Sequence, residues 1–345
     1  MSDDTNKRKI EHIDIIAADH EVDRRKYYFD GIHLTHRALP ELDLERIDPS
    51  VTFMGKRLSF PLLISSMTGG DHDLIRTINR NLATAAEATG VAMGVGSQRV
   101  MFTNPAARDS FELRTQAPAA LLFANLGGVQ LNCDFTIDHC RQAVGALDAD
   151  GLYFHLNPLQ EAVQPEGDTN FSGLAEKICA IAQQLGTPVI LKEVGAGISP
   201  ADVALVIDKG IRYIDVAGTG GTSWSRIEHR RNAKIEDANN LGESFQDWGI
   251  PTPMALKLLS PYRDRITLIA SGGVRNGIDM AKAVILGAAL CGLASPFLEA
   301  AKESADRVIA VVNTLKREFV TAMFLLGIDR IDRLQGNDEL IIGDE

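Results

Sequence analysis

The sequence lacks the features that mark several large classes of protein. Its four cysteines form no CxxC pair, aromatic residues make up only 6 % of the chain, and the net charge is −11 rather than basic. The cysteines therefore predict reduced, mostly buried thiols in a cytoplasmic protein, and no disulfide framework. The acidic balance argues against nucleic-acid binding along a basic face.

Long hydrophobic runs are also missing. Residues 1–30 are charged and lack the apolar stretch of a signal peptide. Elsewhere Gly, Lys or Asp interrupts each apolar run well before the roughly 20 residues that a membrane span needs. We therefore expect no membrane partner. With 345 residues and 45 % hydrophobic composition, the chain has material for one large domain or two ordinary ones.

What the chain does contain is a regular alternation of short apolar runs and helical patterns. Runs that are apolar throughout are typical of strands covered on both faces, as in a parallel sheet. Eight such units in roughly 250 residues match an α/β fold of the (β/α)8 barrel type, and a doubly wound open sheet is the alternative. The predicted strands are 62–65, 91–95, 121–126, 152–157, 189–194, 213–217, 267–271 and 290–294, and the predicted helices include 73–88, 136–146, 173–185, 201–208, 277–287 and 302–327.

This pattern divides the chain into three parts. We expect an N-terminal extension over 1–60 that contributes to the binding site, the barrel over 61–328, and an acidic, partly disordered tail over 329–345. The connection 219–250 after the sixth strand is long for such a loop, and long ordered loops in these folds usually cover an active site.

Polar residues and glycines gather where the predicted strands end, which is where barrel proteins place their sites. The densest group is HLNPLQE, in which His155, Asn157, Gln160 and Glu161 fall within seven residues. Two glycine-rich turns, DVAGTGGTSW (215–224) and ASGGVRNG (270–277), follow the sixth and seventh strands. Consecutive glycines let backbone N–H groups converge on an anion, so we predict phosphate binding there.

Lys192 ends the fifth strand between apolar neighbours. A buried ammonium without a partner is costly, so a partner is expected. Schiff-base chemistry, stabilisation of negative charge on a bound flavin, and a salt bridge to a neighbouring carboxylate remain open.

Taken together and in this order, MTGG, GVGSQR, ANLG, HLNPLQE, KEVGAGIS, AGTGGTSW and SGGVR resemble the type 2 isopentenyl-diphosphate isomerases, which are FMN-dependent (β/α)8 proteins. The resemblance runs from Arg8-Lys9 to about Leu293-Ala294, nearly the whole chain. HLNPLQE and AGTGGTSW are specific to that family, whereas SGG-x-R is shared by many FMN barrels.

The resemblance implies a role for each matching residue. Ser66, Met67, Thr68, Ser97 and Asn125 would contact the flavin ring, and Lys192 would lie at its N1/O2 edge. Thr222, Gly272, Gly273, Arg275 and Ala294 would surround the ribityl phosphate. Arg8, Lys9, Ser97, Gln98 and Arg99 would grip a substrate diphosphate, Gln160 would touch the substrate, and Glu161 would bind Mg²⁺.

The implied reaction is the reversible conversion of isopentenyl diphosphate to dimethylallyl diphosphate in isoprenoid biosynthesis. Reduced FMN would serve as acid and base, with NADPH as the reductant and no net redox change. Gln160 and Lys192 are expected to be catalytic, as are His155 and Asn157, which we expect to orient the diphosphate or the groups around Glu161. Gln160 is a poor base, so it would relay or orient a proton. Family members are cytoplasmic homo-oligomers, often tetramers or octamers.

Other side chains and functions stay open at this stage. His12 follows Arg8-Lys9 and is a candidate to assist them, and Trp224 either covers the flavin or substrate or belongs to the loop core. An FMN-dependent 2-hydroxy-acid oxidase or dehydrogenase would need a His base near the seventh strand, where the nearest histidine is His229. A non-catalytic flavin-binding protein would not need Gln160, Glu161 or the basic residues.

Overall fold

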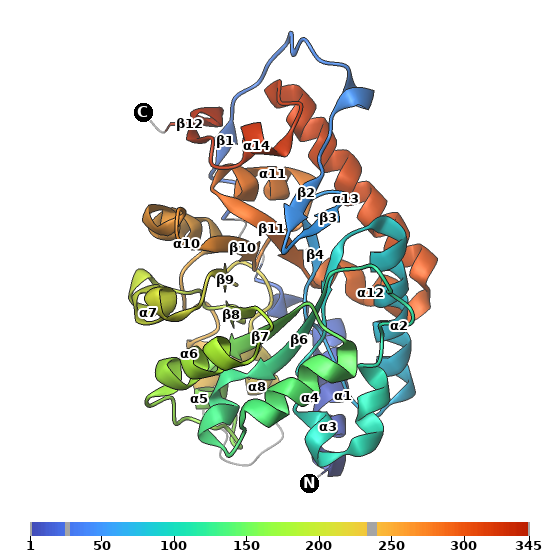
Figure 1. Cartoon of the computed structure of the whole chain (residues 1–345), viewed down its shortest axis with the longest axis vertical. Helices are drawn as coiled ribbons and strands as arrows, with labels where there is room; N and C mark the ends of the chain where they lie inside the picture. The colour runs from blue at the N-terminus through green and yellow to red at the C-terminus, as the bar shows by residue number, and fades with distance from the viewer. Residues whose placement is uncertain (1, 25–27, 233–239, 344–345) are drawn as a thin grey trace.

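Eight parallel strands close into a barrel with helices around it in the computed structural model of the chain (Figure 1). The structure describes residues 2–24, 28–232 and 240–343. The strands are β4 (Leu62–Ile64), β5 (Ala92–Gly94), β6 (Leu122–Gly127), β7 (Gly151–Leu156), β8 (Val189–Glu193), β9 (Tyr213–Asp215), β10 (Thr267–Ser271) and β11 (Ala288–Leu293). They follow chain order round the barrel, and β11 pairs with β4 to close it. The predicted (β/α)8 barrel is confirmed, and the open sheet is excluded.

The strands lie at the predicted places because their residues are buried on both faces. Every residue of β6 and of β8 is buried. Inward side chains such as Phe123, Tyr153 and Ile190 form a cluster inside the barrel, separate from the larger core between strands and helices. This filling makes the barrel a packed core rather than a pore.

A short hairpin closes the barrel at the amino ends of its strands. Strands β2 (Val51–Phe53) and β3 (Lys56–Leu58) pair antiparallel, and Phe53 and Leu58 join the inner cluster. The Phe53 ring lies 5.4 Å from that of Tyr213, the first residue of β9. Part of the extension 1–60 therefore lies at the end of the barrel opposite the carboxyl ends of the strands.

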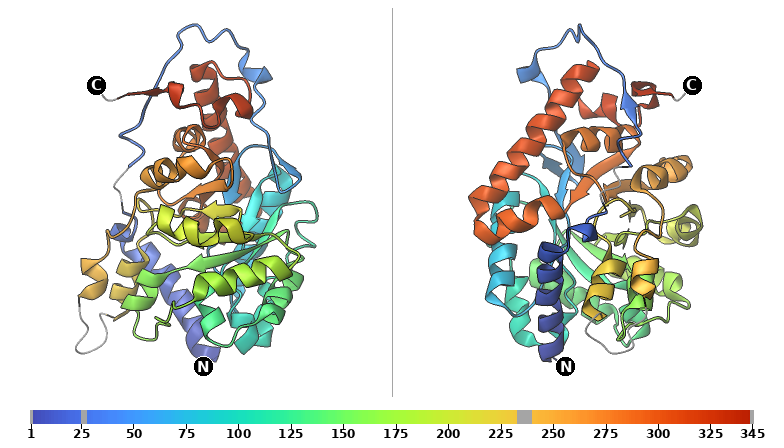
Figure 2. Two further views of the ribbon diagram at one scale, coloured as in Figure 1. Left: turned by 60° about the vertical axis from the view of Figure 1, so that its left-hand side comes forward. Right: turned by 180° about the vertical axis from the view of Figure 1, so that it is seen from behind.

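The outer helices surround the sheet (Figure 2), and their apolar residues pack on it. They are α2 (Asp73–Thr89), α4 (Ile137–Leu147), α6 (Leu174–Gln184), α7 (Pro200–Val206), α10 (Thr252–Leu259), α11 (Gly277–Ile285), α12 (Ser295–Glu303) and α13 (Ala305–Leu326). In α2, Ile75, Ile78 and Leu82 recur at helical spacing and are buried, and the helix ends at Gly90 with φ of 66°. The predicted helix positions are thus confirmed to within a few residues.

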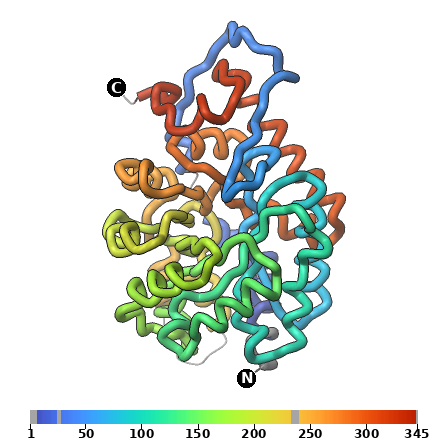
Figure 3. The backbone as a smooth tube through the Cα atoms, in the orientation of Figure 1, coloured from blue at the N-terminus to red at the C-terminus, as the bar shows by residue number. Residues whose placement is uncertain are grey.

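The two ends of the chain are more structured than their sequences suggest. Helix α1 (Ser2–Ala18) packs against α8 (Trp224–Asn232), which with α9 (Leu241–Ser244) lies in the long connection after β9. After α1, the N-terminal segment loops over the end of the molecule that holds α13 and α14 (Ile331–Leu334), and it then enters the barrel (Figure 3). None of the described helices is both long enough and apolar enough to cross a bilayer.

The expectation of a partly disordered tail is wrong for residues 329–343. Ile331 and Leu334 of α14 are buried, and β12 (Ile341–Ile342) pairs antiparallel with β1 (His33–Leu34). These apolar side chains and the paired backbone outweigh the acidic composition that favoured disorder.

We expect Phe319→Ala to lower the free energy of unfolding by about 3–5 kcal/mol, the usual cost of removing a buried aromatic ring. Phe319 is 0 % exposed in α13, which packs on both α2 and α11. Leu325→Ala is the matched control on the same helix, because Leu325 is 41 % exposed and its loss should cost little. Chemical denaturation followed by circular dichroism measures both, and equal losses would contradict this account of the α13 packing.

Candidate active site

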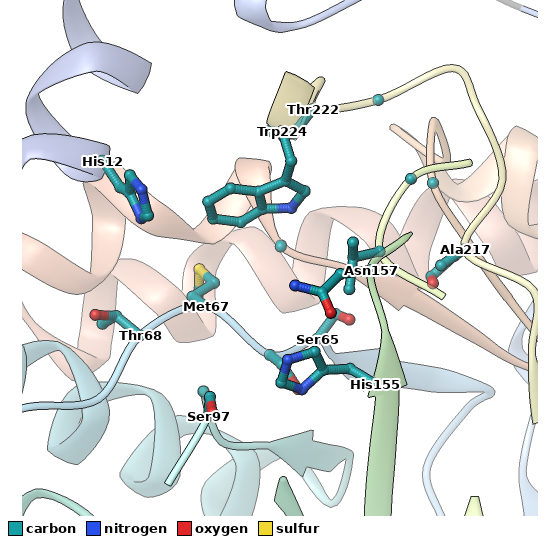
Figure 4. A pocket seen from close by; sticks show the side chains of 18 of the residues that line it. His12, Ser65, Met67, Thr68, Ser97, His155, Asn157, Ala217, Thr222 and Trp224 are labelled. Carbon is teal, nitrogen blue, oxygen red and sulfur yellow. The ribbon is translucent and has the colours of Figure 1, made fainter. Parts of the chain in front are cut away.

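A cavity of about 470 Å³ opens at the carboxyl ends of the barrel strands and is covered by α1 and the segment that begins at Trp224. Figure 4 shows His12 and Trp224 on one side of it, with Met67, Ser97 and His155 reaching it from the barrel. All but one of the predicted site residues line it, namely Arg8, Lys9, Ser66, Met67, Thr68, Ser97, Arg99, Asn125, His155, Asn157, Gln160, Glu161, Lys192, Thr222, Gly272, Gly273, Arg275 and Ala294.

Gln98 is the exception, because its side chain lies outside the cavity lining. Its side chain is 0 % exposed, its Oε1 accepts from the backbone N–H of Asn125 at 2.9 Å, and its Nε2 donates to the carbonyl of Ala143 at 2.8 Å. Both ends of the amide are used inside the protein. Gln98 therefore ties the end of β6 to α4 while its neighbours Ser97 and Arg99 face the cavity.

Glu161 lies at the end of β7, on the short helix α5 (Pro158–Val163) that follows Asn157. Its Oε1 accepts from Asn157 Nδ2 at 2.8 Å, and its Oε2 accepts from Gln164 Nε2 and the backbone N–H of Asp168, each at 2.7 Å. The carboxylate is 6 % exposed and is held by neutral donors rather than by a cation. Asn157 Oδ1 is buried without a hydrogen-bond partner.

These oxygens fit a hard divalent cation that takes few protein ligands. The described residues contain no group of three or more His, Cys, Asp or Glu side chains that could enclose a metal. Mg²⁺ usually keeps several waters and binds through one or two carboxylates plus substrate phosphates. Glu161 could thus hold such an ion only together with water and a phosphate-bearing ligand.

Sequence reasoning missed Glu228, which lies in α8 and is 0 % exposed. Its Oε1 accepts from Gln160 Nε2 at 2.9 Å and lies 3.2 Å from His12 Nε2, and Arg231 of the same helix completes the group. Burial alone would raise the pKa of Glu228, but the hydrogen bond and charge of His12 and the charge of Arg231 outweigh it and lower that pKa to about 2. The only signal for Glu228 was its place in the long connection that was expected to cover the site.

The N-terminal helix is fixed at the cavity by charge. Arg226 donates through Nε to Asp19 Oδ2 at 2.9 Å, and Arg230 donates to the same oxygen at 2.6 Å. The His12 ring meets the Trp224 ring at 5.2 Å, edge to face. Lys9 lies deep enough that burial, with the charge of Arg8, lowers its pKa to about 8. His12 and Trp224, which the sequence left open, are therefore both part of the cavity wall.

His155 is held as a neutral ring. Its Nδ1 lies 2.7 Å from Asn125 Oδ1, and Asn125 Nδ2 donates to Ser66 Oγ and to the carbonyl of Val95, each at 3.0 Å. Burial, together with the charges of Lys9, Lys192 and Arg99, lowers the pKa of His155 to about 3. A ring with that pKa is a neutral imidazole near neutral pH, so it can donate or accept a hydrogen bond but is not an imidazolium that could act as an acid.

Lys192 has the partner that its burial requires. Its Nζ lies 2.8 Å from Asp215 Oδ2 and 2.9 Å from Ser271 Oγ, and the ring of Tyr153 lies below it at 5.7 Å. The strand register places Lys192 of β8 beside Asp215 of β9. This geometry favours the salt bridge among the three alternatives, and it keeps the Nζ at the floor of the cavity.

The glycine turns after β9 and β10 pack against each other. Gly272 and Gly273 have φ of +91° and +78°, and a Cβ on Gly272 would lie 2.1 Å from the carbonyl oxygen of Gly218. A Cβ on Gly221 would lie 2.8 Å from the backbone N of Gly273. Only glycine fits there, so the backbone forms a cradle that side chains cannot fill.

The two halves of the cavity together fit FMN. The glycine turns and Arg275 could take its phosphate, Lys192 could stabilise negative charge on its ring, and Thr68, which lines the cavity, has a buried Oγ1 without a partner. Arg8, Lys9, Arg99 and Glu161 remain for a second, anionic ligand.

Comparison with known proteins places the chain in an FMN-dependent family. Residues 2–117 and 156–340 match the family described as FMN-dependent dehydrogenase. The chain is 55 % identical to the isopentenyl-diphosphate delta-isomerase of Paracoccus zeaxanthinifaciens, over 97 % of this chain and 96 % of that one. It is 52 % identical to the protein of that name from Hydrogenovibrio crunogenus, over 99 % and 100 %.

Solved structures show the same fold at low identity. A mandelate oxidase variant aligns with a TM-score of 0.63 and 19 % identity, over 89 % of this chain and 87 % of that one. A flavocytochrome b2 variant aligns with a TM-score of 0.65 and 19 % identity, over 94 % and 79 %. At this identity the likeness concerns the barrel and not the chemistry.

The neutral state of His155 predicts a pH dependence of stability. Because its pKa falls from 6.5 to about 3 in the folded protein, the unfolded chain takes up a proton first as the pH drops. The stabilisation is complete above pH 6.5 and is lost as the pH falls from there toward 3, by at most about 1.4 kcal/mol per pH unit. We expect His155→Gln to flatten the decline of unfolding free energy between pH 6 and pH 4. His36→Gln, at an exposed histidine, should leave the slope unchanged, and identical slopes in both variants would contradict the prediction.

Proposed function

The chain belongs to the FMN-dependent dehydrogenase family and, by its relatives, to the isopentenyl-diphosphate delta-isomerases within it, and we propose that it converts isopentenyl diphosphate to dimethylallyl diphosphate and back. The observation that carries this proposal is one cavity with two ends whose groups suit anions. One end has the glycine turns and Arg275, and the other has Arg8, Lys9 and Arg99 near Glu161.

The second end suits a diphosphate. Three cationic side chains line it. Of these, the arginines are better partners for phosphate oxygens than the lysine, because a guanidinium can bind two oxygens at once. We propose that Glu161 would hold Mg²⁺, which would neutralise charge on the diphosphate. Asn157 and Gln164, which hold the two Glu161 oxygens, would orient that carboxylate toward the ion.

The reaction removes a proton from one carbon of the allylic unit and adds one two carbons away, and positive charge develops between them. Bound FMN in its reduced form, with NADPH as reductant, would supply the acid and base. Glu228, with a pKa of about 2, stays negative at any pH near neutrality and holds the Gln160 amide in place by accepting from its Nε2. The Gln160 amide is held at its oxygen and at its nitrogen, because its Oε1 accepts from Asn157 Nδ2 at 3.1 Å while its Nε2 donates to Glu228.

Other residues hold the reactants and exclude water. Neutral His155 and Asn125 form a fixed pair against the ring site, and Lys192 with Asp215 forms its charged floor. Helix α1 covers the mouth and brings His12 to Glu228. We propose that residues 1–60 contribute to the substrate site through α1, and that residues 61–328 form the FMN-binding catalytic barrel.

A 2-hydroxy-acid oxidase on the same fold is less well supported. Such an enzyme needs a histidine base at the cavity. Of the described histidines only His12 and His155 line it, and the candidate His229 instead lies 3.8 Å from Glu243, outside the lining. His155 has a pKa of about 3 and is engaged by Asn125, so its use as a base would need a different arrangement.

The assembly and location are part of the same proposal. We propose a cytoplasmic homo-oligomer, a tetramer or octamer. The four free cysteines support a reducing compartment. Exposed Met254 and Leu258 on α10 and Leu205 on α7, neighbouring helices in Figures 1 and 2, offer an apolar face to another subunit.

The first test follows the proton. Purified protein is mixed without oxygen in D₂O with FMN, NADPH, Mg²⁺ and isopentenyl diphosphate, and products are followed by NMR. We expect dimethylallyl diphosphate that carries deuterium, formed only with reduced flavin and without matching loss of NADPH. A flavin-loaded protein that leaves the substrate unchanged but oxidises 2-hydroxy acids would overturn the proposal.

Glu161→Gln tests the metal assignment. We expect the variant to bind FMN with an unchanged absorption spectrum and to need at least about tenfold more Mg²⁺ for half-maximal activity, because it loses a charged oxygen ligand. Glu176→Gln, at an exposed glutamate on α6, is the control and should behave as the original protein. An unchanged Mg²⁺ requirement in Glu161→Gln would remove Glu161 from the metal site.

A further inference from the structure

Arg99, which lines the diphosphate end, already has an anionic partner within the protein. Its Nη1 lies 3.1 Å from Asp168 Oδ2. Gln130, buried in the cavity wall, points its Nε2 at the same oxygen from 3.4 Å. The side chains of Arg99 and Asp168 are 41 % and 29 % exposed, so solvent reaches the pair and an incoming anion could reach it too.

Asp168 is held in this place by the backbone. Its N–H donates to Glu161 Oε2 at 2.7 Å, so the loop that carries it is tied to the proposed metal ligand. At Gly167 an added Cβ would lie 1.8 Å from the carbonyl oxygen of Glu161, which shows how closely this loop packs on α5. The carboxylate of Asp168 is therefore a fixed feature of the diphosphate end and not a mobile surface charge.

The same arrangement recurs around the cavity. Among the described lining residues there are three arginines, and each is paired with an internal carboxylate. Arg8 Nη1 lies 3.5 Å from Glu166 Oε1, and Arg275 Nη2 lies 2.5 Å from Asp23 Oδ1. Any external anion must share or displace these partners, and Asp168 is the one that is anchored beside Glu161.

We propose that the Asp168 carboxylate competes with the diphosphate for Arg99, lowers the affinity of the site for the diphosphate and so speeds release of the product. The proposal rests on the function proposed above. Substrate and product carry the same diphosphate, so a tight hold on it binds ground and transition states alike and does not speed the chemical step. It slows product release instead, which limits turnover in many enzymes. The Asp168 carboxylate repels the bound anion and can replace it at Arg99. Both effects lower the affinity of the site for the diphosphate.

The test replaces Asp168 by Asn and measures binding of inorganic pyrophosphate to the FMN-loaded protein by calorimetry, with and without Mg²⁺. The backbone N–H that supports Glu161 is unaffected by this change. We expect pyrophosphate to bind roughly three- to tenfold more tightly, the size expected for a partly exposed charge pair plus the lost repulsion. In turnover, KM for isopentenyl diphosphate should fall while kcat does not rise. A merely structural role would weaken binding, so the direction of the change is diagnostic.

Asp48→Asn is the matched control, because Asp48 pairs with Arg57 at 3.2 Å and neither residue lines the cavity. Its pyrophosphate affinity should not change. Equal or weaker binding in Asp168→Asn would overturn the proposal, and a loss seen only with Mg²⁺ would assign Asp168 to the metal instead. Arg99→Ala separates this failure from a failure of the proposed function. If Arg99→Ala binds pyrophosphate normally, the diphosphate site itself is misplaced. If Arg99→Ala binds pyrophosphate more weakly and Asp168→Asn does not bind it more tightly, only the role of Asp168 is contradicted.

Discussion

The buried carboxylate of Glu228 is the constraint on which the mouth of the barrel depends. A carboxylate with no exposed surface must be met by donors from whatever packs against it. Those donors come from three parts of the chain, His12 of α1, Gln160 of α5 and Arg231 of α8 itself. The contact of His12 with Glu228 fixes the N-terminal helix beside the cavity, and the same helix brings Arg8 and Lys9 to its wall. One buried charge thus helps to place the helix that covers the mouth together with two of its basic residues.

The rest of the cavity follows the same rule of local neutralisation at different depths. At the dry floor, Lys192 and Asp215 lie on adjacent strands in register, and both are almost fully buried. At the wetter rim, Arg99 and Asp168 are partly exposed. Breaking a charge pair at the buried floor costs more free energy than breaking one at the partly exposed rim. The depth of each pair is therefore consistent with the proposed order, with the cofactor at the floor and the substrate diphosphate at the rim.

Sequence alone could place the strands and most of the site, because both depend on local patterns. Eight apolar runs give eight buried strands, and a closed parallel barrel brings their carboxyl ends to one rim. Glu228 could not be selected this way, since its role depends on which face of α8 meets α1. The orientation of Gln98 could not be read for a related reason, because it stands between two residues that face the cavity while its own amide has backbone partners in β6 and α4. The tail was misjudged because composition hid the burial of Ile331 and Leu334.

The neutral histidine at the end of β7 separates this site from an oxidase built on the same barrel. Removing a proton from a hydroxy acid needs a base whose pKa lies near the working pH. Burial, with the cations around it, lowers the pKa of His155 to about 3, and the group that stays anionic is Glu228, which accepts a hydrogen bond from Gln160. A cavity lined by Arg8, Lys9 and Arg99 suits an anionic ligand, and its buried neutral histidine is a poor base for removing a proton from a hydroxy acid. The electrostatics of the cavity, more than the shape of the fold, therefore argue against the oxidase.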